Sequence, residues 1–130
     1  MGVCAPNNEL ANKTNTLEEL LEHNLILREP GSGTRDILEH ALYNQNLSIY
    51  DFKSHMVIGN SSAIKQLCQQ NAGITFIYRE AVKDQLLSGT LKEIAISNFT
   101  VNHPFNFVYL KNTPNQVQLE YWFDKIIRLR

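Results

Sequence analysis

The apolar residues of this chain follow two different periods, and the two periods alternate along the sequence. Short, nearly continuous apolar runs at residues 3–5, 25–27 and 74–78 have the length and composition of buried strands. Apolar positions that recur every three or four residues, as they do after Thr34 and after residues 60–62, indicate one face of a helix. Alternation of this kind is typical of an α/β layer with a largely parallel sheet.

Capping and turn residues set the ends of the predicted elements. Thr16 and Glu19 form a capping-box pair, which begins a helix that we expect to run to residue 22 or 23. Gly59 ends a predicted strand at 55–58, and Gly73 is the expected C-cap of the helix that follows it. The other predicted elements are a helix at 80–87, strands at 91–96 and 105–110, and a final helix that begins at Thr113-Pro114 and runs to Arg130.

Two predicted strand-to-helix turns carry the polar chemistry. The first spans residues 29–35, where two glycines let the backbone approach a ligand and hydroxyl groups lie beside a helix N-terminus. The second spans residues 59–62 and again places hydroxyls and free amides before a helix. Ligands of open α/β sheets bind outside the carboxyl ends of strands, so both turns are candidates for a carboxylate, phosphate or sulfate. The alternative is that these residues only cap their helices.

The first turn matches neither of the common nucleotide-binding loops. Asp36 stands where a dinucleotide fingerprint would have its third glycine, and no Gly-Lys-Ser/Thr sequence follows. We therefore expect no nucleotide cofactor at this turn.

Composition and charge exclude several classes of protein. Hydrophobic residues make up 43% of the 130 residues, an ordinary globular share. Twelve Lys and Arg residues face thirteen Asp and Glu residues, and the net charge of −1 lacks the basic excess of a nucleic-acid binder. The sequence has no run of about 18 apolar residues and no signal-peptide pattern at its start, so we expect no membrane contact and a cytoplasmic location.

The cysteines and histidines show no metal-binding pattern. Cys4 and Cys68 have no Cys-x-x-Cys partner, which excludes a disulfide scaffold or zinc ribbon and fits a reducing compartment. Cys68 lies on the apolar face of its helix and is expected to be a small core residue. The four histidines have no metal-ligand spacing, so we expect neither a metal nor another cofactor.

An enzyme active site is also a weak interpretation. Residues 59–63 faintly resemble a nucleophile elbow, and Ser61, Asp84 and His103 fall in the order of a hydrolase triad. Ala63 replaces the expected glycine, however, and the chain is short for an α/β-hydrolase. We expect no enzymatic activity.

Two segments together resemble the effector-binding domain of LysR-type transcriptional regulators. They are LILREPGSGTRDILEHAL at 25–42 and MVIGNSSAIKQLCQQNAGITFIYREAVKDQLLSGTLKEI at 56–94. The GSGTR turn and the order of the pieces from Gly59 to Leu91 are the strongest marks, and the likeness extends over residues 3–127. Asn60 departs from many relatives, which leaves the identity of the effector open.

The resemblance implies a periplasmic-binding-like type 2 fold, in which two α/β subdomains are joined by crossing strands and an effector lies in the cleft. Subdomain two would be complete at residues 7–100, and subdomain one would be partial. Residues 1–6 would be the first crossing strand, and residues 101–130 the return strand and C-terminal helix of subdomain one. Carried over by position, the ligand-binding residues are Ser32, Gly33, Thr34 and Arg35 from the first turn and Asn60, Ser61 and Ser62 from the second.

The implied function is ligand sensing for transcription regulation. A small anionic or polar metabolite would bind between the subdomains and shift their relative orientation without chemical change. A separate N-terminal winged helix-turn-helix would bind the DNA. Arg35 suits a carboxylate but equally suits a cap or a bridge within its helix. The alternatives are a solute-binding module of a transport system with the same fold and, more remotely, the small serine hydrolase.

We predict that the chain forms a homodimer, as the family resemblance implies. The predicted C-terminal helix has apolar residues on more than one face, and a surface helix needs only one apolar stripe. Light scattering should give about twice the chain mass, and charged residues in place of Trp122 and Ile126 should shift the protein towards monomer or aggregate. A well-behaved monomer with Trp122 buried in its own chain would contradict the prediction.

Overall fold

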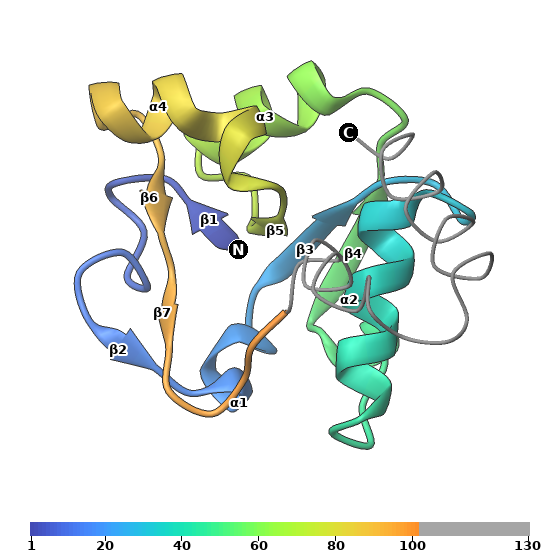
Figure 1. Cartoon of the computed structure of the whole chain (residues 1–130). Coiled ribbons are helices and arrows are strands. Elements are labelled where there is room, and N and C mark those ends of the chain that lie inside the picture. The colour runs from blue at the N-terminus through green and yellow to red at the C-terminus, as the bar shows by residue number, and fades with distance from the viewer. Residues whose placement is uncertain (102–130) are drawn as a thin grey trace, which may run out of the picture.

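Strand β3 (Asn24–Leu27) separates two apolar cores. In this computed structural model, which describes residues 1–101, Leu25 and Leu27 belong to one buried cluster and Ile26 to the other. Successive side chains of a strand point to opposite faces, so β3 is buried on both sides. The chain therefore forms the α/β layer expected from its sequence, with helices on both faces of a sheet (Figure 1).

The sheet is mixed, which corrects the prediction of a largely parallel one. Its other strands are β1 (Gly2–Cys4), β4 (Ser54–Val57), β5 (Thr75–Phe76) and β6 (Lys92–Glu93). β3 is parallel to β4, and an isolated parallel bridge from Leu25 to Ile74, the residue before β5, connects this pair to the three strands β5, β1 and β6. β1 lies between β5 and β6 and is antiparallel to both. The apolar pattern identified these segments as strands, but it carries no information about the direction of β1 relative to β5 and β6.

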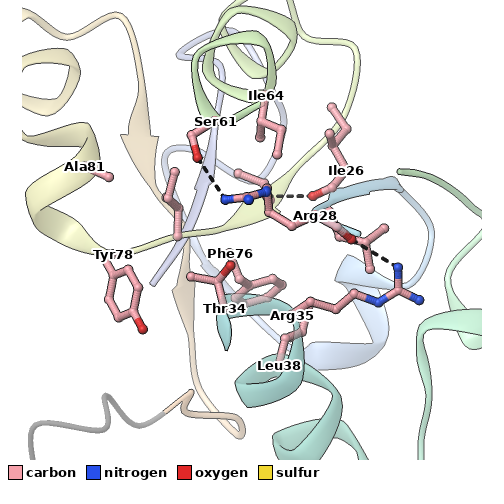
Figure 2. Close-up of a pocket in the computed structure, with 13 residues that line it drawn as sticks. Ile26, Arg28, Thr34, Arg35, Leu38, Ser61, Ile64, Phe76, Tyr78 and Ala81 are labelled. Atoms are coloured by element: carbon pink, nitrogen blue, oxygen red, sulfur yellow. Dashed lines mark hydrogen bonds between the residues drawn. The ribbon is translucent and has the colours of Figure 1, made fainter. Parts of the chain in front are cut away.

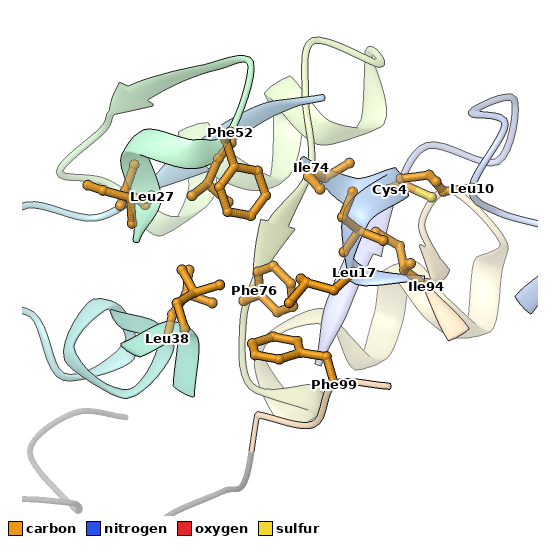
Figure 3. Close-up of a cluster of buried hydrophobic side chains, with 14 residues drawn as sticks. Cys4, Leu10, Leu17, Leu27, Leu38, Phe52, Ile74, Phe76, Ile94 and Phe99 are labelled. Atoms are coloured by element: carbon orange, nitrogen blue, oxygen red, sulfur yellow. The ribbon is translucent and has the colours of Figure 1, made fainter. Parts of the chain in front are cut away.

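The helices divide between the two faces of the sheet. They are α1 (Leu17–Leu20), α2 (Gly33–Tyr43), α3 (Ser61–Gln69) and α4 (Lys83–Ser88), with 3-10 helices η1 (Ile49–Asp51) and η2 (Arg79–Val82). Leu38 of α2 packs in the cluster that contains Leu25 and Phe76, as Figure 3 shows for part of it. Ile64 of α3 packs with Ile26 in the second cluster. Each fully buried Leu or Ile contributes about 1.5–3 kcal/mol to stability.

The capping box at the start of α1 is confirmed in both halves. The Thr16 hydroxyl accepts a hydrogen bond from the Glu19 amide at 3.3 Å, and the Glu19 carboxylate accepts one from the Thr16 amide at 3.3 Å. Lys13 pairs with Glu19 and holds the pKa of that carboxyl below its ordinary value. The helix is shorter than predicted, because the amides of Glu22 and His23 bond to carbonyls three residues back and turn the chain into β3.

Gly73 is not the C-cap of α3, which corrects a second prediction. Asn71 takes the left-handed conformation there, with φ of 62°. Its amide bonds to Cys68 O at 3.0 Å and the Ala72 amide to Leu67 O at 2.9 Å, which is the Schellman pattern. Asparagine tolerates this conformation better than most residues. Gly73 has a different role, because a Cβ there would lie 2.7 Å from Asn24 O and obstruct the pairing of the two strand segments.

Most other predicted elements are present with altered ends. The predicted helix at 80–87 begins as η2 and continues as α4, and Gly89 ends it with φ of 81°. The predicted strand at 91–96 is divided into β6 and β7 (Ala95–Ile96), and β7 pairs in parallel with β2 (Thr14–Asn15). The predicted strand at 105–110 and the C-terminal helix lie outside the described residues, as does the surface invoked for the homodimer.

Both cysteines are core residues, as expected for Cys68. Cys4 and Cys68 are fully buried, and this burial raises the pKa of Cys4 to about 11 and that of Cys68 to about 12. Thiols with such pKa values are protonated at neutral pH and react slowly. Among the described residues, no helix has both the length and the apolar composition to cross a membrane.

We predict that Gly73→Ala destabilises the protein by about 1–3 kcal/mol, because the added methyl group meets a backbone carbonyl that is held in the sheet. Gly59→Ala is the matched control, since its Cβ would have only one neighbour, an oxygen of Glu29 at 3.9 Å. Urea denaturation should show a lower midpoint for the first variant and little change for the second. Equal stability of the two variants would contradict the assigned role of Gly73.

Candidate functional site

A pocket of about 90 Å³ lies where β3 ends and where α2 and α3 begin (Figure 2). Buried apolar side chains, among them Ile26, Ile64 and Phe76, line its base. Its polar lining comes from Arg28, Thr34, Arg35, Ser61, Thr75 and Tyr78. The Thr75 hydroxyl donates to Ile26 O at 2.6 Å, which leaves the two arginines and the hydroxyls of Thr34 and Ser61 as the groups considered below.

The N-termini of two helices meet at this pocket. Thr34 is the second residue of α2, and Ser61 is the first residue of α3. Figure 2 shows their side chains on opposite sides of the pocket. The first amides of a helix have no partner within the helix and carry a partial positive charge, so both hydroxyls lie where negative charge is stabilised.

Arg28 is a pocket residue that the sequence analysis missed. It follows the last residue of β3, and its Nη1 donates to the Ser61 hydroxyl at 3.3 Å. Its Nε donates to Glu29 at 2.8 Å, and this hydrogen bond holds the pKa of the Glu29 carboxyl below its ordinary value. The rule that ligands bind at the carboxyl ends of strands was applied to the glycines and hydroxyls of the turn. Applied to the first residue after the strand, it would have identified Arg28.

The guanidinium of Arg35 is engaged within the protein. The residue is 8% exposed, its Nη1 donates to Arg28 O at 3.0 Å, and its Nε lies 3.5 Å from a Glu39 oxygen. In Figure 2 it points away from Ser61, and the side chain forms part of the pocket wall. The contact with Glu39 is a bridge within the helix, as in the alternative to a ligand role, and the hydrogen bond to Arg28 O also holds the backbone of Arg28. A direct contact between Arg35 and a ligand stays a prediction.

The other predicted site residues flank the pocket. Ser32 is the N-cap residue of α2, and its hydroxyl lies 3.1 Å from that of Thr34 without capping the backbone. Gly33 is buried in the first turn of α2. Asn60 caps α3 by accepting from the Ala63 amide at 3.1 Å, and Ser62 is exposed. The structure thus brings Thr34, Arg35 and Ser61 to the pocket, and the ligand roles of all seven residues stay predictions.

The pocket has the chemistry of an anion site. Its cations and helix N-termini favour negative charge, and its hydroxyls add hydrogen bonds.

Three residues fall in the order of a hydrolase triad in the sequence. The Ser61 hydroxyl accepts a hydrogen bond from Arg28, Asp84 lies on α4, and His103 lies outside the described residues. Within residues 1–101, no group of three or more His, Cys, Asp or Glu side chains could hold a metal ion.

Comparison with known proteins identifies one family. The family described as "LysR substrate binding domain" matches residues 1–128. An uncharacterized HTH-type transcriptional regulator, YeiE of Escherichia coli, is 41% identical over 93 residues, which are 72% of this chain and 31% of YeiE. The HTH-type transcriptional regulator CysL of Bacillus subtilis is 25% identical over 89% of this chain and 40% of CysL. The chain thus spans well under half the length of these relatives.

Solved structures share the fold. The regulatory domain of MetR, a LysR family regulator from Neisseria meningitidis, superposes with a TM-score of 0.61 and 24% identity over 75% of this chain and 44% of that domain. The regulatory domain of Synechocystis CcmR in complex with 2-PG gives a TM-score of 0.62 with 18% identity over 98% of this chain and 61% of that domain.

We predict that Arg35→Met lowers the free energy of unfolding by about 1–3 kcal/mol without any ligand, because it leaves the Arg28 carbonyl without its donor. Methionine keeps an apolar stem of similar length. The matched control is Arg79→Met, which removes an exposed arginine paired with Glu93 and should change stability by under about 1 kcal/mol. If Arg35 served only as a ligand contact, Arg35→Met would leave the stability of the ligand-free protein unchanged.

Proposed function

The chain belongs to the LysR substrate-binding domain family, and we propose that it is the ligand-sensing part of a LysR-type transcriptional regulator. The family resemblance and the periplasmic-binding-like type 2 fold expected from the sequence are confirmed. One observation carries the proposal: the N-termini of α2 and α3 bring Thr34 and Ser61 to one pocket beside Arg28. The ligand is a small metabolite that bears an anionic group.

The size of the pocket limits what these residues bind. Pockets that enclose a whole drug-sized ligand have volumes of about 300–1,000 Å³. A pocket of about 90 Å³ suits one charged head group, such as a carboxylate or phosphate. We infer that the rest of the ligand is held by subdomain one, across the cleft from residues 7–100. Among the solved structures of similar fold, CcmR is in complex with 2-PG, and the effector-binding domain of QuiR is in complex with shikimate.

The signal is carried by a conformational equilibrium. A ligand that binds one arrangement of the two subdomains more tightly than another shifts the population towards it, and no bond is made or broken. Residues 1–6 and the segment after residue 100 would be the crossing strands about which the subdomains move. In this proposal the protein needs no cofactor and catalyses no reaction. It acts in the cytoplasm as a homodimer and reaches DNA through a separate N-terminal winged helix-turn-helix.

Paired substitutions test whether the pocket binds the ligand. Once a thermal-shift screen of anionic metabolites has found a ligand, Thr34→Val and Ser61→Ala should each weaken its binding by about 1.5–3 kcal/mol, the cost of a hydrogen bond to a charged group. Calorimetry measures the affinity. Ser62→Ala tests the ligand role that the sequence predicted for Ser62. Ser62 follows Ser61 on α3 but does not line the pocket, so a ligand held in the pocket should bind this variant unchanged.

The outcomes separate binding from capping. If Thr34→Val and Ser61→Ala lower stability but leave the affinity unchanged, the hydroxyls support only the helix ends and the proposed site is wrong. If Ser62→Ala alone weakens binding, the ligand lies on the outer side of α3 and the pocket is not its site.

A further inference from the structure

The guanidinium of Arg28 already holds an anion, the carboxylate of the next residue. Its Nε donates to Glu29 Oε1 at 2.8 Å, and its Nη2 donates to Glu29 Oε2 at 3.4 Å. Two parallel hydrogen bonds of this kind are the arrangement in which arginine recognises carboxylate and phosphate groups in general. The third engaged donor, Nη1, bonds to Ser61. The edge of the guanidinium formed by Nε and Nη2 therefore faces Glu29, and Arg28 also lines the pocket.

The carboxylate of Glu29 lies between the two turns that form the site. Glu29 starts the turn between β3 and α2, and its Oε2 lies 3.9 Å from the position that a Cβ on Gly59 would occupy. Gly59 belongs to the turn before α3. An anion that bonds to Ser61 and Thr34 and reaches Arg28 has to compete with this carboxylate for the guanidinium.

We propose that Glu29 is an internal competitor for Arg28 and thereby a specificity-determining residue for the charge of the ligand. This inference rests on the proposed function, because it requires an anion in the pocket. A monocarboxylate that displaces Glu29 exchanges one carboxylate for another. The displaced carboxylate stays beside the pocket and repels the bound anion, and by Coulomb's law a dianion is repelled about twice as strongly as a monoanion. Glu29 therefore lowers the affinity for both kinds of anion and disfavours dianionic oxyanions, such as a phosphate group, relative to monoanions.

The ion pair between Arg28 and Glu29 is weak enough for a ligand to replace it. The Arg28 side chain is 32% exposed and that of Glu29 is 48% exposed. Exposed ion pairs are weak, so a ligand can replace this one without unfolding the site. Glu29 is exposed beside the pocket and does not belong to its apolar base, so the released carboxylate can be solvated.

Charge-neutral substitution of Glu29 tests the proposal. The affinities of inorganic phosphate and of acetate are measured by calorimetry at pH 7.5 and constant ionic strength. Glu29→Gln should bind both anions more tightly, by about two- to five-fold for phosphate, as expected for the loss of a weak competing pair, and by less for acetate. The ratio of the phosphate affinity to the acetate affinity should rise. Glu29→Asp keeps the charge and should leave that ratio unchanged.

Two further variants identify the cause. Glu93→Gln removes the carboxylate of another exposed arginine pair, with Arg79, that does not line the pocket, and it should change phosphate affinity by less than about two-fold. Arg28→Gln should lose binding of both anions. Circular dichroism checks that each variant is folded.

The results distinguish failure of this inference from failure of the proposed function. If the unchanged protein binds phosphate but Glu29→Gln binds it no more tightly, or if Glu93→Gln gains as much, Glu29 is not a competitor and the inference is overturned while the anion site stands. The same holds if Arg28→Gln binds phosphate as the unchanged protein does. If no variant binds either anion, the proposed anion site itself is wrong.

Discussion

Strand β3 is hydrogen-bonded along both edges and buried on both faces, and the rest of the structure depends on that double burial. The Ile26 amide bonds to Ile74 O at 2.8 Å on one edge, and β4 pairs along the other. The alternating side chains of β3 divide between the two cores. Because the strand cannot shift without exposing one of these cores, its carboxyl end is a fixed point, and Arg28 leaves the sheet at that point.

Hydrogen bonds of Arg35 and Arg28 connect the fixed end of β3 to the pocket. Arg35 is buried on α2 and donates to the Arg28 carbonyl at 3.0 Å, so the helix and the strand end are held together. Arg28 in turn reaches Ser61 at the start of α3. A buried guanidinium must be paired to offset its desolvation, and the carbonyl of Arg28 and the carboxylate of Glu39 provide this pairing. These contacts thus link the N-termini of α2 and α3 at the pocket.

Local signals predicted the parts of this site that depend on neighbouring residues. The Thr16–Glu19 capping box, the helix that follows residue 32 and a cap of α3 among residues 60–62 all follow from patterns within a few residues, and the structure selects Asn60 as that cap. Gly73 shows the limit of such signals. A glycine after a helix indicates a C-cap, but Asn71 satisfies that need two residues earlier, and the requirement for Gly73 comes from Asn24, which is distant in sequence.

The sequence by itself determined the α/β class, the two turns and the family, because apolar periodicity, glycine spacing and the order of motifs are properties of a linear chain. Only the tertiary structure decided which polar residues meet. It placed Thr34 and Ser61 around one pocket and left Ser62 outside it, since adjacent residues on a helix point about 100° apart. It also engaged Arg35 in the interior and brought Arg28 to the pocket, because the pairing of a guanidinium depends on which carbonyl and carboxylate groups folding brings within reach.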